Sequence, residues 1–424
     1  MSPFNLPFPP TIFCTISFAT FFAAIRLSRR GRLYLAPLLF GSAVFSVKNS
    51  TYLSWVFPGA PSYWNLFMCV WMHHAASVLY IEPFQLPLVS SKGKEAWILA
   101  YKIWNDPQRQ LKWSTYLQKK NPEPTAYTKR FIFVLRRVVK VAICWLLQLR
   151  VIGPTVSTYF RLTAADFAPS YHPFVSRLLW PDSGPAITIR EIQLRSLMSV
   201  YWIWLAFLLL DGANVLLSIF FVAVLRIDTP EEWPPLYGSP LRGSSIRGFW
   251  AKFWHRLAGP SCACSGRLIT RRIMRLAPHS NYEKVVIAFW TFFVSGVFHA
   301  VADWQGGETV MPVGEMQFWL ANFAAGAIEM LVVGAVGRRL RDGRLGQALR
   351  SNVLRKTIGF VWVFAFFFWV VPMWQYPKFY AAMRPARRVV IREPGFAPES
   401  FGESGSARTG NWSAPGIEFI SLLD

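Results

Sequence analysis

Two histidines in apolar surroundings are the residues of this chain best suited to chemistry. The first, His299, ends the run Phe-Val-Ser-Gly-Val-Phe-His at 293–299. On a helix, Ser295 lies one turn before His299 on the same face, and Gly296 lets another helix or a ligand approach closely. Imidazole is the side chain best suited to removing a proton near neutral pH. The pattern indicates either a general base or a structural histidine bonded to a backbone carbonyl.

The second, His255, closes a run of aromatic and basic residues. Ser-Ile-Arg-Gly-Phe-Trp-Ala-Lys-Phe-Trp-His occupies 245–255, after Pro-Pro-Leu-Tyr-Gly at 234–238. Arg247, Lys252 and Arg256 accompany four aromatic residues between 249 and 254. We expect this run to lie at a membrane surface with its aromatic side chains inward and its cations outward. A plain interfacial helix has the same composition.

The other polar residues in apolar runs are predicted to have structural roles. His73 and His74 adjoin each other, so both cannot face one partner, and packing or a carbonyl contact is favoured over a metal. Asp211 and Glu329 are expected to bridge helices, with contact to a substrate hydroxyl as the alternative. The five cysteines form no zinc-like or disulfide pattern. We expect free thiols and no metal site.

The elements that position these residues must lie in a membrane. Of 424 residues, 53% are hydrophobic and 17% aromatic, only 16% are charged, and the mean hydropathy is +0.29. Soluble domains carry about a quarter charged residues. The composition therefore excludes an ordinary soluble domain and predicts an all-α polytopic membrane protein.

Eight apolar runs approach the length of about 20 residues that spans a bilayer as a helix. They are 9–25, 33–48, 63–82, 138–153, 197–225, 284–303, 316–337 and 357–375. The first is expected to be a signal anchor rather than a cleaved signal peptide. The long run 197–225 contains Asp-Gly-Ala-Asn at 211–214 and could form one helix or two half-helices.

The net charge of +23 is concentrated between these runs. Residues 26–32, 83–137, 226–282 and 338–356 together carry 31 basic and 7 acidic residues. Alternation of basic and neutral connections follows the positive-inside rule, which places the basic segments in the cytosol. The excess of basic residues is therefore a topology signal, and we expect no nucleic-acid partner.

The chain divides into three parts. Residues 1–153 hold N-terminal membrane helices with a basic cytosolic loop, and 154–375 hold a catalytic membrane domain. Residues 376–424, rich in Pro, Gly and Ser, are expected to form a flexible tail. This tail contains Asn411 in an Asn-Trp-Ser triplet, which is an N-glycosylation acceptor if the tail is luminal.

The two histidine motifs, in this order in a multispan chain, resemble the wax-synthase-like branch of the membrane-bound O-acyltransferases. The resemblance is closest over about 190–375. It implies an O-acyltransferase-type helical bundle with an internal substrate tunnel, and it makes His299 the catalytic base. In the related sterol and diacylglycerol acyltransferases, Asp and Asn stand where this chain has Lys252 and His255. The role of His255 as a second catalytic residue therefore follows the wax-synthase pattern.

The resemblance also implies the reaction. Moving an acyl group from a thioester to an alcohol needs a base, a donor to the developing oxyanion and substrates held together. Direct transfer is favoured over an acyl-enzyme route. Acyl-CoA is then a co-substrate and no cofactor is bound. Its phosphates are expected to dock on a basic surface formed by Arg247, Lys252, Arg256, Arg271 and Arg272. Trp254, Ser295 and Gly296 complete the expected substrate-binding residues.

Chains of this type look like fungal O-acetyltransferases that modify terpenoid or meroterpenoid secondary metabolites. Acetyl-CoA is thus the expected donor, a lipophilic alcohol the acceptor, and the endoplasmic reticulum membrane the location. A long-chain wax-ester synthase is the alternative within the class. A multipass transporter is the alternative outside it, although no repeated halves are visible.

Overall fold

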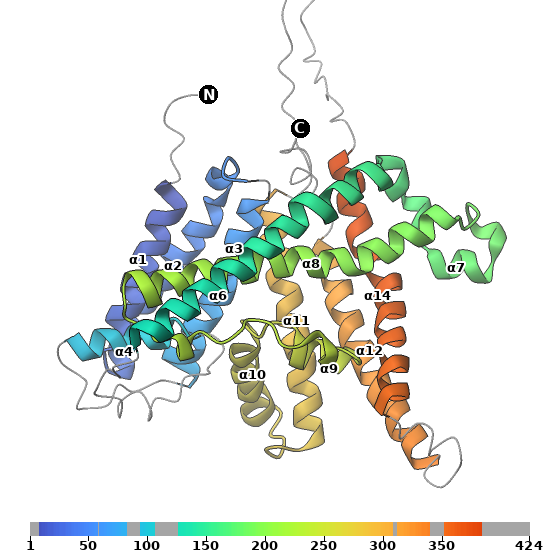
Figure 1. Ribbon diagram of the computed structural model, residues 1–424. Helices are drawn as coiled ribbons and strands as arrows, with labels where there is room; N and C mark the ends of the chain where they lie inside the picture. Colours follow the sequence, from blue (N-terminus) through green and yellow to red (C-terminus); the bar gives the residue numbers. More distant parts are fainter. Residues whose placement is uncertain are drawn as a thin grey trace, which may run out of the picture.

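A computed structural model describes residues 8–57, 59–82, 94–106, 126–307, 312–339 and 352–383. These residues form helices and connecting segments with no strand, as predicted (Figure 1). The helices are α1 (Phe8–Ala24), α2 (Arg29–Lys48), α3 (Ala60–Ala76), α4 (Lys94–Trp104), α6 (Ala126–Leu147), α7 (Phe174–Leu179), α8 (Ile189–Ile219), α9 (Ile246–Gly248), α10 (Gly259–Leu268), α11 (Asn281–Gln305), α12 (Pro312–Arg339) and α14 (Asn352–Met383).

Short π-helical turns extend several of these helices. Ser77–Ile81 follows α3, Gln148–Ile152 follows α6, Phe220–Val224 follows α8, Phe249–Phe253 follows α9 and Ile269–Ile273 follows α10.

The first three helices pack side by side, with α4 across one end (Figure 1). Polar side chains join α1 to α2 inside this group. The hydroxyl of Ser17 donates to the carbonyl of Leu39 over 2.6 Å, and that of Ser46 donates to the carbonyl of Pro10 over 2.7 Å. Arg32 is buried, and its guanidinium donates to carbonyls at the ends of α1 and α3. Buried polar groups therefore have partners where the helix ends meet.

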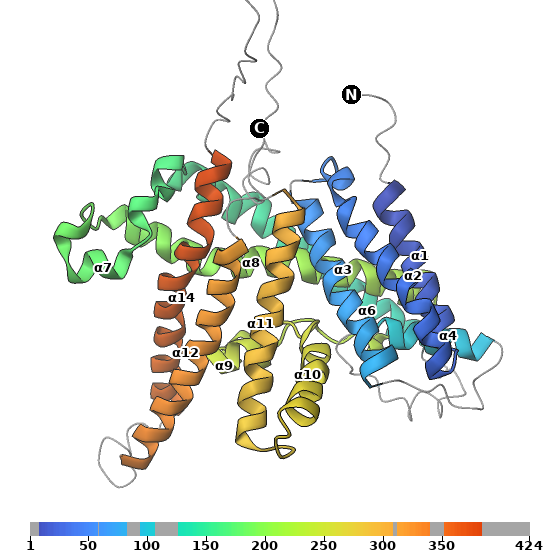
Figure 2. The same ribbon diagram turned by 180° about the vertical axis from the view of Figure 1, so that it is seen from behind.

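The second group consists of α11, α12 and α14, which run alternately in opposite directions (Figure 2). The long α8 crosses the other helices instead of running along them (Figures 1 and 2). An aromatic core fills the space between α8, α12, α14 and the segment around α9. The α9 segment crosses the face of α11 and α12 between their ends (Figure 2).

The chain is a polytopic membrane protein, but the expected count of eight spans is not confirmed. Among the described residues, four helical segments are long and apolar enough to cross a bilayer, namely Ile189–Val224, Asn281–Gln305, Pro312–Ala335 and Val353–Met383. The expected runs 9–25 and 63–82 lie in α1 and α3, which are shorter, while α2 and α6 carry several basic residues.

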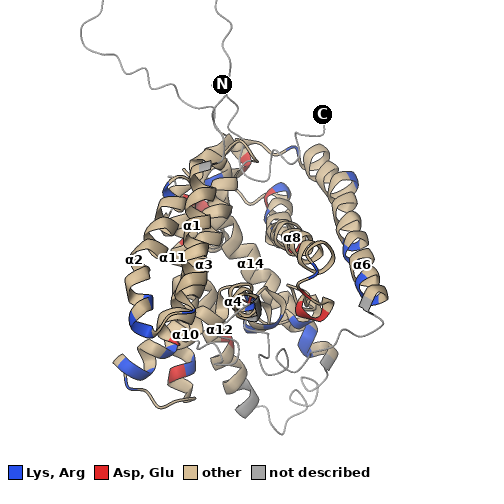
Figure 3. Cartoon of the chain, turned by 90° about the vertical axis from the view of Figure 1, so that its left-hand side faces the viewer, with Lys and Arg blue, Asp and Glu red and all other residues tan. Residues whose placement is uncertain are grey.

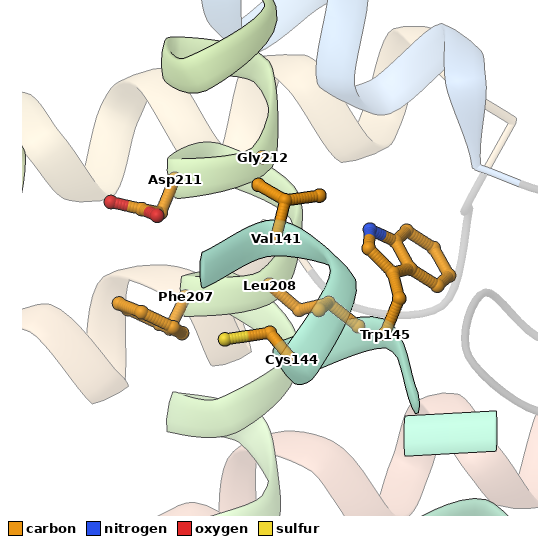
Figure 4. A pocket seen from close by; sticks show the side chains of 7 residues that line it. All are labelled: Val141, Cys144, Trp145, Phe207, Leu208, Asp211 and Gly212. Carbon is orange, nitrogen blue, oxygen red and sulfur yellow. The ribbon is translucent and has the colours of Figure 1, made fainter. Parts of the chain in front are cut away.

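The alternative of two half-helices at 197–225 is wrong, because α8 is continuous through Asp211. The carboxylate of this residue pairs with the ammonium of Lys140 on α6 over 2.7 Å. Figure 4 shows Asp211 beside a small hollow between α6 and α8, near Phe207 and Cys144. Asp211 therefore bridges two helices, as expected from its place in an apolar run.

The final helix continues past the expected end of the catalytic domain at 375, since α14 runs to Met383. Residues 384–424, including Asn411, lie outside the described residues.

One end of the bundle gathers several basic stretches. Figure 3 shows Lys and Arg positions grouped where α2 begins and where α10 ends. There Arg267 pairs with Glu82, the residue after the α3 extension, over 2.8 Å. The start of α2 and the end of α10 thus lie at the same end of the molecule.

Candidate active site

His255 lies at the end of a compact aromatic turn. The hydroxyl of Ser245 accepts a hydrogen bond from the backbone N–H of Gly248 over 2.8 Å and caps α9. The chain then makes the π-helical turn Phe249–Phe253 and leaves it extended at Trp254. Phe249 and Trp254 are buried, whereas Arg247, Lys252 and Arg256 are exposed. Aromatic side chains thus point inward and cations outward, as predicted, but the segment is not the regular interfacial helix that was the alternative.

Close backbone packing fixes this turn. The N–H of Gly238 donates to the carbonyl of Phe253 over 2.8 Å. A Cβ atom at Gly238 would lie 2.0 Å from the carbonyl oxygen of Lys252, so only glycine fits. On the other side, the carboxylate of Glu329 on α12 accepts from the backbone N–H of Ile246 over 2.8 Å and from the indole of Trp362 over 3.0 Å. Glu329 therefore bridges helices and holds the start of α9, as expected.

The imidazole of His255 is half-buried among aromatic rings. Its ring centroid lies 5.6 Å from that of Tyr237, edge to face, and 5.3 Å from that of Trp254. Its Nδ1 atom is buried without a hydrogen-bond partner among the described residues. Burial, with a smaller effect of the charge on His299, lowers the pKa of His255 to about 3. His255 is therefore neutral at physiological pH.

His299 lies in the C-terminal half of α11 and faces α12. Its ring centroid is 4.9 Å from that of Trp319, with 34° between the planes. Gly296, one turn earlier, is buried where the two helices touch, because a Cβ atom there would lie 2.9 Å from Met316 Sδ and 3.2 Å from Trp319 Cβ. Of the two expectations for Gly296, the structure shows the close approach of a helix. Ser295 is half-buried on the same helix.

The fold brings the two histidines together although 44 residues separate them. The charge on His299 reaches His255. Aromatic rings connect them: Trp254 lies 5.4 Å from Trp250, and Trp250 lies 5.0 Å from Trp319. The indole of Trp250 donates to the side-chain carbonyl of Asn322 over 2.9 Å. Both histidines therefore belong to one apolar site.

Three buried polar atoms around this site lack hydrogen-bond partners among the described residues. They are Nδ1 of His255, the indole nitrogen of Trp319 and the hydroxyl oxygen of Tyr237. Burial of Tyr237, and more weakly the charge of Asp211, raises the pKa of the phenol, which stays protonated. Buried polar groups are normally paired. These atoms are thus available as donors and acceptors to a ligand in otherwise apolar surroundings.

Sequence reasoning missed part of this site. Tyr237 stood in the quoted Pro-Pro-Leu-Tyr-Gly run, but its contact with His255 depends on the turn at Gly238. Trp319 and Asn322 lie in an apolar span among other aromatic residues, so no local signal marks them. The spacing of Asn322 and Trp319, three residues apart on a helix, could have indicated one shared face.

The predicted basic surface is partly engaged. Arg271 pairs with Glu283 over 2.6 Å, while Arg272 is exposed. Arg247, Lys252 and Arg256 remain the exposed cations nearest in sequence to His255.

The two adjoining histidines 73 and 74 have structural contacts. The Nε2 atom of His74 contacts the carbonyl of Ile103 at 3.0 Å, and that of His73 contacts the hydroxyl of Ser265 at 3.0 Å. His73 also lines a hollow of about 340 Å³ with Val294 and Phe298. Val294 points about 100° away from Ser295, and Phe298 about 100° away from His299, so the hollow lies on another face of the helix.

Comparison with known proteins agrees with the histidine motifs. Residues 233–321 match the model of the membrane bound O-acyl transferase family. The resemblance to the membrane-bound O-acyltransferases is confirmed. The matched segment contains both His255 and His299, and it covers the α9 turn, α10, α11 and the part of α12 that carries Trp319.

Several curated relatives are named acetyltransferases. One from Arthrinium sp is 30% identical over 45% of this chain and 43% of its own length, and one from Humicola fuscoatra is 31% identical over 50% of each chain. A third, from Hericium erinaceus, is 21% identical over 90% of this chain and 94% of its own length. The chain thus spans about half the length of the first two relatives. No solved structure matches it.

Proposed function

We propose that this protein transfers an acetyl group from acetyl-CoA to a hydroxyl of a lipophilic secondary metabolite of the terpenoid or meroterpenoid class. One observation carries the proposal: the segment that matches the O-acyltransferases brings His255 and His299 to one aromatic cluster, in which several buried polar atoms lack partners among the described residues. The names of the relatives support acetyl as the group transferred.

In the proposed reaction, His299 removes the proton from the acceptor hydroxyl as the oxygen attacks the thioester carbonyl. The carbon–sulfur bond then breaks, the ester forms, and the proton passes from the imidazolium of His299 to the departing sulfur of coenzyme A. Transfer is direct, because both substrates meet at one base and no serine or cysteine nucleophile is required. The alcohol gains the acetyl group and coenzyme A leaves as the thiol.

His255 has a different role in this scheme. Because the pKa of His255 is about 3, its imidazole is neutral at neutral pH. As a neutral imidazole it can donate one N–H bond to the thioester carbonyl, where negative charge develops. The hydroxyl of Tyr237, beside His255, can supply a second donor.

Acetyl-CoA is proposed to reach the site from the cytosolic face. Its phosphates would bind Arg247, Lys252 and Arg256, which are exposed on the segment that ends at His255. The acceptor would arrive from within the membrane, which we propose to be that of the endoplasmic reticulum.

The test is incubation of membranes containing the protein with radiolabelled acyl-CoAs of two to sixteen carbons and a panel of hydroxylated terpenoids, sterols and fatty alcohols. We expect an acetyl ester of a polycyclic alcohol. His299→Ala should lower its formation by about 10²- to 10⁴-fold, as loss of a general base does. His279→Asn, at an exposed histidine outside the site, is the matched control. Long-chain esters of fatty alcohols would replace the proposal by a wax-ester synthase, and full activity of His299→Ala would refute the mechanism.

A further inference from the structure

Three charged side chains from three helices meet close to His299. The ammonium of Lys378 on α14 contacts the carboxylate of Asp303 on α11 over 2.6 Å and also that of Glu315 on α12. Glu315 is fully buried, and the side chains of Asp303 and Lys378 are 17% and 23% exposed. Ionised side chains inside a bilayer are costly and commonly functional. This cluster therefore needs a physical reason beyond helix packing.

The charge of this cluster is not balanced. Two carboxylates face one ammonium, so the ionised cluster carries one net negative charge. The indole of Trp374 donates to one oxygen of Glu315, while the other oxygen has no hydrogen-bond partner among the described residues. A net charge inside a bilayer is costly unless a nearby cation compensates it. The remaining charge can stabilise a cation nearby.

A further clue is the position of the cluster relative to the proposed base. Asp303 follows His299 by four residues, which places both side chains on one face of α11. The charges of Asp303 and Lys378 both act on His299. Trp374 stacks on Phe318 at 4.1 Å, and Phe318 adjoins Trp319, which packs on His299. The cluster is thus the nearest charged neighbour of the proposed catalytic histidine on its own helix.

We propose that Asp303 is a positioning residue that stabilises His299 in its protonated form during acyl transfer, and that Lys378 limits this effect by pairing with Asp303. The proposal rests on the proposed function. The proton taken from the acceptor hydroxyl makes His299 positive only until it passes to the sulfur of coenzyme A. The cluster exchanges no proton in this cycle and acts through its charge.

The test compares Asp303→Asn with Asp303→Glu in membranes, measuring kcat, KM for acetyl-CoA and the pH profile. Asp303→Asn should lower kcat by roughly 10- to 100-fold with KM changed by less than about threefold, because the lost interaction is made in the transition state. Asp303→Glu, which restores the charge, should recover most of this loss. A merely structural role would lower the amount of folded protein without changing kcat.

The pH profile of the rate tests the proposal independently of the size of kcat. The titratable or charged neighbours to consider are Asp303 on the same helix, Glu315 on α12, Lys378 on α14 and His255 before α10, while His73 on α3 faces Phe298 instead. Asp303→Asn should move the acidic limb of the rate profile to lower pH, and Lys378→Gln should move it to higher pH. Shifts in the same direction, or no shifts, would contradict the proposal.

Controls separate this inference from the proposed function. The double variant Asp211→Asn/Lys140→Gln removes another carboxylate–lysine pair, away from His299, and should keep kcat within about threefold. If Asp303→Asn does not fold, Lys378→Gln carries the test, because it leaves Asp303 charged and should still move the acidic limb to higher pH. An active wild type with full kcat in these Asp303 variants refutes the inference alone. An inactive wild type, or an active His299→Ala, refutes the proposed function.

Discussion

The contact between Gly296 and α12 predicts that one added methyl group will affect catalysis more than folding. In Gly296→Ala the new Cβ atom would lie 2.9 Å from Met316 Sδ and 3.2 Å from Trp319 Cβ. The thioether is at the flexible end of its side chain and can move. The Cβ atom of Trp319 is fixed to the backbone, so α12 must shift by a few tenths of an ångström. That shift carries the indole packed on His299.

The expected magnitudes follow from this geometry. A misplacement of about 1 Å at a reacting group can cost about 100-fold in rate, so a shift of a few tenths should lower kcat by roughly 3- to 10-fold. Slight overpacking costs about 1–3 kcal/mol, which the better helix propensity of alanine, about 1 kcal/mol, partly offsets. Gly296→Val should exceed both effects.

The assay is acetyl transfer by membranes matched for protein content, combined with thermal unfolding in detergent. Gly212→Ala is the control, because α8 is also helical there and a Cβ atom would meet nothing within 4 Å. It should retain full activity. Equal and full activity of Gly296→Ala and Gly212→Ala would show that the α11–α12 contact does not position His299.

Three further predictions concern other parts of the site. His255→Ala should lower turnover about 100-fold, and His255→Asn should lower it less, because an amide can donate a hydrogen bond to a carbonyl. Since the pKa of His255 is about 3, neither variant should change the pH profile between pH 5 and 8. A changed profile would show that His255 titrates in that range. Glu329→Leu should lower the free energy of unfolding by about 1–3 kcal/mol, because the indole of Trp362 and the N–H at the start of α9 lose their acceptor. Glu329→Gln should lower the free energy of unfolding less. Equal denaturation midpoints of the two variants in detergent would contradict this. The sidedness can be tested in sealed microsomes with a protein that lacks its native cysteines. Lys252→Cys should react with a membrane-impermeant thiol reagent, whereas Trp304→Cys should react only after permeabilisation. Protection of Lys252→Cys in sealed microsomes would refute the proposed sidedness.

Local sequence was sufficient wherever one helix or one turn determines the outcome. The spacing of Ser295, Gly296 and His299 predicted that a helix or a ligand approaches closely beside the histidine, and the structure shows a helix there. The mixture of aromatic and basic residues around Trp254 predicted inward rings and outward cations, which is also observed. These features depend on periodicity and on the cost of burying charge, both of which can be read from adjacent residues.

Contacts between distant segments could not be predicted in this way. Lys378 was placed in the C-terminal tail, because residues 376–424 are rich in Pro, Gly and Ser and carry mixed charge. In the structure α14 continues through both prolines to Met383. The charge of Lys378 is compensated by Asp303 and Glu315, 75 and 63 residues away in sequence, so its burial becomes favourable only once α11, α12 and α14 have assembled.

The depth of His299 explains why the α9 turn enters the bundle. His299 lies 18 residues after the start of α11, about 27 Å along the helix axis from the end where the basic stretches gather. A site at that depth is accessible to a membrane-dissolved alcohol but distant from a charged cytosolic donor. The segment from Arg247 to Arg256 shortens this distance, because its exposed cations and His255 lie on the same few residues and it crosses α11 and α12 between their ends. Since Gly238 permits that close packing and Glu329 anchors its start, both residues should determine how far acetyl-CoA can reach toward His299.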